Sequence, residues 1–310
     1  MTNLKKLGLS ALAGSLVATT GYAGALDVTG GAKVSYVSQD ETEVTGNPFS
    51  MTRTISFAGS GEMDNGMTIS YGQTLDAGAF SSSSLSLDMG DAGKLSFSNA
   101  TASGHGISAY EDKMPTAAEQ VWDDLDGQAN GLANISKTNT IGYGTSFAGA
   151  NVSVSYNPDA GSTTAESSKS VAVDFAPVDG AMIFYSMADK AGGTVNTGTD
   201  VWTAGGTYTA GAVTAGIQMT SLDLSAANSD VDRTHIAASF AVNEDLSVSW
   251  GMSTVEFEAA SKVDQEDSGF SVSYTMGSMT IAAAANNSDN VGGTSGTDDT
   301  HKEMSIAFAF

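Results

Sequence analysis

Alternation of apolar and small polar residues is the dominant pattern of the chain. In NTIGYGTSFAGANVSVSY, residues 139–156, Ile141 and Tyr143 share one side while Gly142 and Gly144 share the other. A period of two on either side of a tight turn predicts a β-hairpin. From Leu26 onward about sixteen such runs follow one another, each near ten residues long, which is the length of a tilted membrane-crossing strand.

The connections between these runs are predicted to alternate in length. We expect long loops around 39–49, 77–81, 100–137, 158–167, 190–198, 223–230, 258–266 and 288–300. We expect short turns around 64–66, 90–93, 148–150, 178–180, 210–211, 243–245 and 276–277. Tight turns at one end and long loops at the other are typical of an outer-membrane β-barrel.

The small residues of the polar face decide which side faces inward. Gly, Ser, Thr and Ala cannot fill a protein core to normal packing density, but a wide aqueous lumen needs no filling. We therefore predict that the apolar face contacts lipid and that the sheet closes, because backbone groups in hydrocarbon must all be paired. The predicted fold is all-β: a 16-stranded antiparallel transmembrane barrel, wide enough for an aqueous channel.

The first 25 residues have the layout of a secretory signal peptide. Lys5 and Lys6 precede a short apolar stretch, and Ala23-Gly24-Ala25 fits a cleavage site, with cleavage after Ala23 as the alternative. We expect residues 1–25 to be the signal and residues 26–310 to be the barrel domain. Without Lys5 and Lys6 the formal net charge goes from −23 to −25, which argues against a nucleic-acid partner.

Several short stretches resemble the general diffusion porins of Gram-negative bacteria. They are LDVTGGAKVSY at 26–36, TRTISFAGSGEMDNGMTISYGQ from Thr52, NTIGYGTSFAG from Asn139 and the terminal Phe310, and they occur in that family's order. The resemblance implies an outer-membrane location, a homotrimer surrounded by lipid, and a third external loop that folds into the lumen. It implies passive diffusion of small hydrophilic solutes and ions.

The longest connection, Ala100 to Lys137, corresponds to that third loop. Thr116-x-x-Glu119 has the form of a helix-capping box and is followed by an apolar stripe, so we expect a short helix with Trp122 packed on the barrel wall. The resemblance implies a constriction in which loop carboxylates face basic residues of the wall. The candidate loop residues are Glu111, Asp112, Glu119, Asp123, Asp124 and Asp126.

The candidate wall residues are Lys33, Arg53 and Arg233. Alternation places Lys33 and Arg233 on the lumen side, whereas Arg53 shares the parity of Ile55 and Phe57, so it faces outward or follows a β-bulge. The charge balance favours cation-preferring conduction. Ordinary solvated loop charge is the alternative interpretation of each carboxylate.

The sequence gives little support for an enzyme, a cofactor-binding site or a dedicated metal site. His105, His235 and His301 are scattered, Gly104 to Ala109 lacks the context of a dinucleotide site, and the chain has no Cys. We expect no enzymatic activity, no cofactor and no dedicated metal site, apart from loosely bound Ca²⁺ at loop carboxylates such as Asp124 and Asp126. Two alternative functions stay open: a plugged structural or adhesive barrel, and a soluble secreted adhesin or solenoid.

Overall fold

The computed structural model describes residues 26–39, 46–99, 104–126, 139–158, 167–191 and 199–310. The expected signal peptide, residues 1–25, lies outside the described residues, as do residues 127–138 of the longest loop. Among the described residues no helix is long and apolar enough to cross a membrane.

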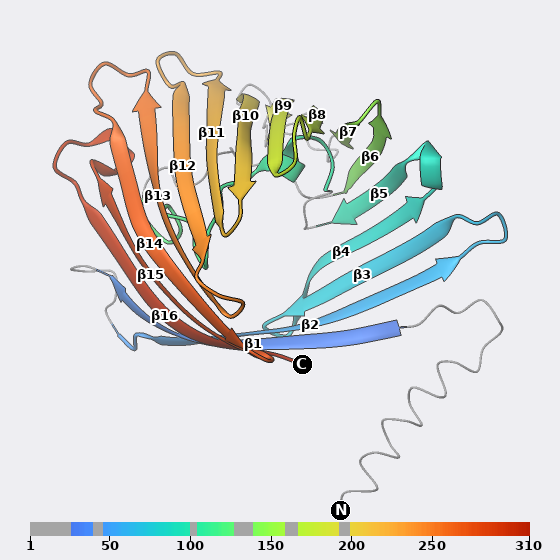
Figure 1. Cartoon of the computed structure of the whole chain (residues 1–310). Coiled ribbons are helices and arrows are strands. Elements are labelled where there is room, and N and C mark those ends of the chain that lie inside the picture. Colours follow the sequence, from blue (N-terminus) through green and yellow to red (C-terminus); the bar gives the residue numbers. More distant parts are fainter. Residues whose placement is uncertain (1–25, 40–45, 100–103, 127–138, 159–166, 192–198) are drawn as a thin grey trace, which may run out of the picture.

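Sixteen antiparallel strands close into one barrel, which confirms the predicted fold (Figure 1). The strands are β1 (Leu26–Gln39), β2 (Phe49–Glu62), β3 (Thr68–Asp76), β4 (Ala79–Asp88), β5 (Lys94–Asn99), β6 (Thr140–Phe147), β7 (Ala150–Asn157), β8 (Ser168–Phe175), β9 (Ala181–Ala191), β10 (Thr199–Ala210), β11 (Val213–Leu224), β12 (Val231–Ala241), β13 (Leu246–Phe257), β14 (Gln265–Met276), β15 (Met279–Asp289) and β16 (Asp299–Ala309). Three short 3-10 helices are described: η1 (Gly90–Ala92), η2 (Gly106–Tyr110) and η3 (Val291–Gly293).

The two ends of the chain close the ring. Each strand pairs with its sequence neighbours, and β1 pairs with β16 in the register Lys33↔Ala307. The backbones of Gly30 and Phe310 exchange two hydrogen bonds of 2.7 and 2.9 Å. The Phe310 ring lies directly over Gly30, where an added Cβ would come within 2.6 Å of it and would displace the ring. The last residue is thus part of the closure.

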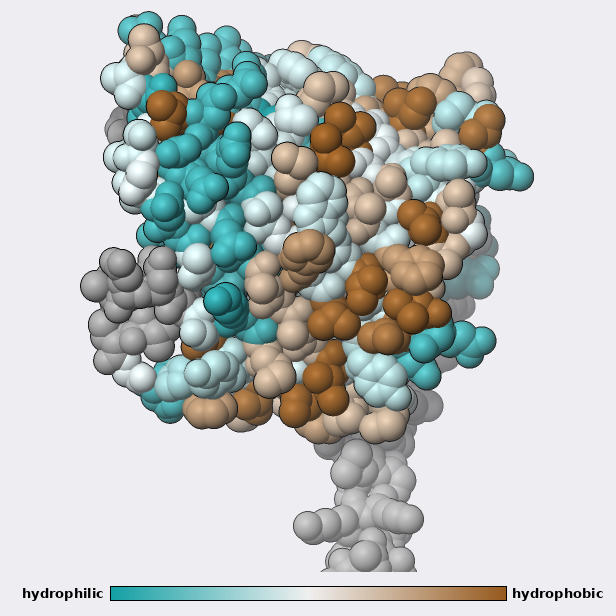
Figure 2. Space-filling view, turned by 60° about the vertical axis from the view of Figure 1, so that its left-hand side comes forward, coloured by the Kyte–Doolittle hydropathy of each residue, from teal (hydrophilic) through white to brown (hydrophobic). Residues whose placement is uncertain are grey.

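The apolar face looks outward, as predicted. Ile141, Val154 and Tyr156 of the β6–β7 hairpin are each more than 40 % exposed, and the same holds for Phe308 of β16. Apolar side chains spread over the outer surface in Figure 2, while hydrophilic residues gather at the upper left. Ser, Thr and Gly of the same strands point inward, and many of them are buried.

The alternation of connection lengths holds with one exception. The predicted long loop at 77–81 is wrong, because β3 and β4 are joined by Ala77 and Gly78 alone. Both residues have positive φ, 49° and 94°, the combination found in two-residue hairpin turns whose twist matches that of the strands. The end of the barrel that carries the long loops therefore also carries one tight turn.

Candidate functional site: the lumen segment between β5 and β6

Residues 104–126, here called the lumen segment, are the described part of the longest connection and run along the inner wall of the barrel (Figure 1). The segment begins beside β6, β7 and β8. The amides of Gly106 and Ile107 donate to the hydroxyls of Ser153 and Ser170 at 2.9 and 3.1 Å. Ile107 is fully buried against inward-facing residues of β9, β10 and β11, namely Ala188, Val201 and Leu222.

The middle of the lumen segment is bound to β11, β13 and β14. The Gln218 side-chain amide donates to the Tyr110 carbonyl at 2.8 Å. The amide of Ala117 donates to Ser249 at 2.9 Å, and the amide of Ala118 donates to Ser271 at 3.1 Å. These contacts join wall side chains to segment backbone, so they fix the path of the chain.

The end of the lumen segment reaches β15 and β16. The Asn286 side chain donates to the Gln120 carbonyl at 2.9 Å. The Asp126 amide donates to a carboxylate oxygen of Asp299 at 2.7 Å. From β6 to β16 the segment therefore follows most of the barrel's circumference.

The expected helix after Thr116 does not form, and the described helical turn is instead η2, further upstream. The Thr116 hydroxyl donates to the Glu119 carbonyl at 2.6 Å, whereas a capping box requires it to accept from the amide at that position. The backbone groups of Ala117, Ala118 and Gln120 are bound by wall side chains. The Gln120 carbonyl is an acceptor that a helix would use internally, whereas the amides of Ala117 and Ala118 would lie in the first turn, where a helix leaves N–H groups without a backbone acceptor.

The apolar stripe nevertheless packs as predicted. Trp122 is only 4 % exposed and forms a cluster with Met114, Val121 and the wall residue Ala237. Its ring centroid lies 4.4 Å from that of His235 on β12. Wall packing of Trp122 is therefore confirmed.

All six candidate carboxylates lie on the lumen segment. Asp112, Asp124 and Asp126 are exposed within the barrel, whereas Glu111, Glu119 and Asp123 are partly buried. Burial raises the pKa of Glu119 to about 7, and the neighbouring carboxylate of Glu303 adds to the shift. Burial likewise raises the pKa of Asp123. Burial also raises the pKa of Asp112, although hydrogen bonds from Gln120 and Met114 to its carboxylate act in the opposite direction.

Lys33 lies on the lumen side of β1, as predicted, and contacts two carboxylates. Its ammonium donates to Glu303 of β16 at 2.8 Å and lies 3.9 Å from Glu119 of the lumen segment. Arg233 also points inward, but it is only 4 % exposed and lies near the carboxylate of Asp267 on β14. Both wall cations are thus accompanied by acidic groups.

Arg53 does not lie on the lumen wall. It pairs with Ala32 in an unbroken register between β1 and β2, without the bulge that would turn it inward. It therefore shares the outward face of Met51 and Ile55, which are 56 % and 47 % exposed. Simple alternation along β2 gives the correct side, and the motif resemblance does not.

The wall formed by β2, β3 and β4 is polar and, in its middle, uncharged. The register places Thr52 beside the inward-facing Lys33, and so Thr54, Ser56 and Thr74 follow on the same face. The hydroxyls of Ser56 and Thr74 lie 3.1 Å apart. On these three strands, whose residues are all described, no Lys or Arg points into the lumen.

Open space remains beside the lumen segment. A cavity of about 630 Å³ lies between its first part and the inner wall. Its lining includes Asp88, Lys94, Tyr110 and Asp174. The Tyr110 hydroxyl donates to Asp174, and burial together with this contact raises the pKa of Tyr110.

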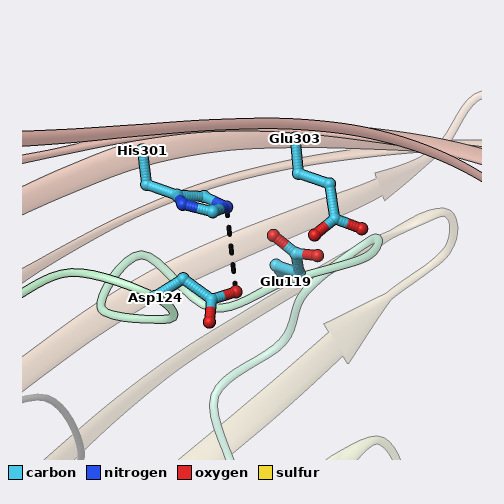
Figure 3. A group of neighbouring side chains, drawn as sticks. All are labelled: Glu119, Asp124, His301 and Glu303. Carbon is cyan, nitrogen blue, oxygen red and sulfur yellow. Dashed lines mark ion pairs between the residues drawn. The ribbon is translucent and has the colours of Figure 1, made fainter. Parts of the chain in front are cut away.

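Two residues of β16 join the site without having been predicted. His301 and Glu303 lie two positions apart on the inward face, and their side chains meet Glu119 and Asp124 of the lumen segment (Figure 3). The sequence does hint at these two residues, because the His-x-Glu spacing in the last strand places both side chains on the same face. This strand pairs with β1, which carries Lys33. The separation of 177 positions between Asp124 and His301 hides the contact from any local pattern.

Comparison with known proteins agrees with this architecture. A family model described as Gram-negative porin matches residues 8–309. The chain belongs to the Gram-negative porin family. It is an outer-membrane porin channel, and the outer face described above is the surface of a membrane-spanning barrel.

Solved structures of the same fold are similar over nearly the whole porin chain. A variant of Rhodopseudomonas blastica porin has a TM-score of 0.63 and 15 % identity, with 92 % of this chain and 100 % of that chain covered. A triple variant of the same porin has a TM-score of 0.63 and 16 % identity at the same coverage. At this identity the likeness concerns the fold. The comparison with curated proteins gave no match.

Proposed function

We propose that this porin passes small hydrophilic solutes and ions by passive diffusion, prefers cations, and is narrowed by the lumen segment. The observation that carries the proposal is the arrangement of charge inside the barrel. Six carboxylates lie on the lumen segment, whose only Lys or Arg is Lys113. The wall of β2, β3 and β4 adds no inward basic side chain.

The paired state of the wall cations supports the same preference. An anion is attracted by positive potential that neighbouring groups leave uncompensated. Lys33 already contacts Glu303, and Arg233 is buried close to Asp267. Neither side chain offers the isolated positive charge that would balance Asp112, Asp124 and Asp126 across the lumen. A transverse field between loop and wall is therefore weaker than the family resemblance implies.

Planar-bilayer recordings across a KCl gradient test the proposal. We expect a reversal potential on the cation side, and a preference that weakens at high salt, because the screening length falls to about 3 Å at 1 M. Neutralising Glu111, Asp112, Asp123, Asp124 and Asp126 as amides should move the reversal potential toward anions. Currents should not saturate sharply with small salts, since passive passage requires no binding cycle.

A matched control carries the same change of formal charge outside the lumen segment. It replaces five carboxylates of the short turns, Asp64, Asp91, Asp179, Glu244 and Asp245, by amides. If both quintuple variants shift selectivity equally, net charge decides the preference and the lumen segment does not. If the unmodified protein inserts but conducts no current, the alternative of a plugged structural or adhesive barrel is correct.

The proposal also covers the oligomeric state of the porin, enzymatic activity and Ca²⁺ binding. We expect a homotrimer in contact with outer-membrane lipid, on the strength of the family resemblance, and native mass measurement in mild detergent tests it by giving three chains or one. Absence of enzymatic activity stays a prediction. Loose Ca²⁺ binding at segment carboxylates also stays a prediction, and the metal titrations described below measure it.

A further inference from the structure

Four side chains from distant parts of the sequence converge at one point of the inner wall (Figure 3). Glu119 and Asp124 come from the lumen segment, and His301 and Glu303 come from β16. One potential ligand atom from each residue can be chosen so that all four lie within 4.8 Å of one another. The Nε2 atom of His301 lies 3.7 Å from a carboxylate oxygen of Asp124.

The state of His301 distinguishes this group from an ordinary cluster of acidic residues. Its side chain is 2 % exposed, yet neither ring nitrogen has a hydrogen-bond partner among the described residues. Buried polar groups are nearly always hydrogen-bonded, because leaving one unpaired costs free energy. The ring points into the cluster (Figure 3), where Glu119 Oε2 is likewise buried without a partner.

The charges of the cluster call for a divalent cation. When all three carboxyl groups are ionised, as metal binding requires, they and the nearby Lys33 ammonium leave a formal charge of −2. Lys33 compensates this charge only in part, because a single ammonium group is shared between Glu303 Oε1 at 2.8 Å and Glu119 Oε1 at 3.9 Å. A divalent ion would neutralise the remainder.

We propose that Glu119, Asp124, His301 and Glu303 bind one divalent first-row transition-metal ion, such as Zn²⁺ or Mn²⁺, and that this ion fastens the lumen segment to β16. The donor set selects the class of metal. Ca²⁺ and Mg²⁺ take oxygen ligands, whereas an imidazole nitrogen suits Zn²⁺, Fe²⁺ and their neighbours. The site goes beyond conduction, and its occupancy does not depend on ion selectivity.

Binding requires a modest contraction. A tetrahedral ion with bonds of about 2.1 Å holds its ligands about 3.4 Å apart, so the widest spacing must close by roughly 1.4 Å. Two ligands lie on regular strand and provide a fixed pair. The other two lie on irregular backbone, and the hydrogen bonds of Gln120 and Asp126 to the wall already hold that stretch in place. Side-chain rotation of Glu119 and Asp124 can therefore supply the movement.

Isothermal titration of the purified, chelator-treated full chain in detergent tests the site. We expect one Zn²⁺ per chain, with Ca²⁺ unable to displace it at large excess. His301→Asn should weaken Zn²⁺ binding at least roughly tenfold, because the loss of a residue that only hydrogen-bonds to a metal ligand already lowers metal affinity by that much. Lys33→Met should strengthen binding, because it removes a cation that competes for Glu303.

Co²⁺ substitution adds a readout that a purely structural role would not change. Its visible spectrum should show a nitrogen-containing site in the unmodified protein and should lose that signature in His301→Asn. Asp88→Asn is the control for loss of a potential metal ligand outside the cluster, because Asp88 is a carboxylate on the lumen face of β4 and does not belong to the four residues. Circular dichroism checks that each variant keeps the barrel.

Three outcomes would overturn the proposal. The first is an absence of saturable Zn²⁺ binding. The second is equal binding by His301→Asn and Asp88→Asn, which would mean an adventitious ion only. The third is Ca²⁺ displacing Zn²⁺ at similar concentration, which would mean loose binding to carboxylates without the imidazole.

Discussion

Replacing Trp122 by Ala should release the lumen segment from the wall. Trp122 is 4 % exposed and packs with Met114, Val121 and Ala237. Truncating a buried Trp to Ala costs about 3–5 kcal/mol. The later part of the segment is also held by four hydrogen bonds of 3.1 Å or less between its backbone and the wall, at Ala117, Ala118, Gln120 and Asp126.

Comparison of these contributions gives the size of the effect. Hydrogen bonds of this kind contribute about 1 kcal/mol each, so the four together are comparable to Trp122 alone. A loss of 3–5 kcal/mol raises the undocked fraction by a factor between about 10² and 4 × 10³, at 1.4 kcal/mol per factor of ten. We therefore expect higher and noisier single-channel currents, together with faster proteolytic cleavage between residues 104 and 126.

Trp250→Ala is the matched control. Trp250 lies on the outer face of β13 and is 40 % exposed, so its removal should leave channel current and segment cleavage unchanged. Trp122→Phe should give an intermediate result and guards against a Trp122→Ala variant that fails to assemble. Identical currents and cleavage in the Trp122 and Trp250 variants would refute the idea that burial of this ring holds the segment.

Two further changes test other contacts of the inner wall. Gly142→Ala places a Cβ within 2.8 Å of His105, so it should shift the start of the lumen segment at a cost of about 1–3 kcal/mol. Gly46→Ala is the control, because its Cβ meets no atom within 4 Å. Proteolytic cleavage of the lumen segment should be faster in Gly142→Ala than in Gly46→Ala. Arg233→Met removes the cation next to the buried Asp267 and should lower the urea-unfolding free energy by about 3–5 kcal/mol. The combination of Arg233→Met with Asp267→Asn should recover most of this loss. Equal losses in the single and double variants would show that the charge of Asp267 does not interact with Arg233.

Local patterns predict the barrel because its strands pair only with sequence neighbours. In the β6–β7 hairpin, alternation alone tells that Ile141 and Tyr156 face outward and that Gly142 faces inward. The same alternation places Lys33 and Arg53 on opposite sides of the wall. The turn at Ala77 and Gly78 is missed because an Ala with positive φ gives no sign of a tight turn.

The site is less predictable because it is formed by contacts across the lumen. The capping pattern at Thr116 is genuine in sequence, but the Thr116 hydroxyl donates to the Glu119 carbonyl, and Asn286 of the wall binds the Gln120 carbonyl that a helix would use. His301 looks isolated along the chain and meets Asp124 only once the last strand and the lumen segment are both in place. No periodicity within either stretch encodes that meeting.

Beside the packing of side chains such as Ile107 and Trp122, the wall holds the main chain of the lumen segment, through hydroxyls that accept hydrogen bonds from peptide N–H groups and side-chain amides that donate to peptide carbonyls. A peptide group is the same whatever side chain it carries, so these hydrogen bonds depend little on which residues the segment contains. Side chains of the segment that face the water and do not bind its backbone, such as Asp126, can therefore change without moving the backbone beneath them. One barrel can therefore hold lumen segments of different charge. Channels that prefer cations and channels that prefer anions can then share the same wall.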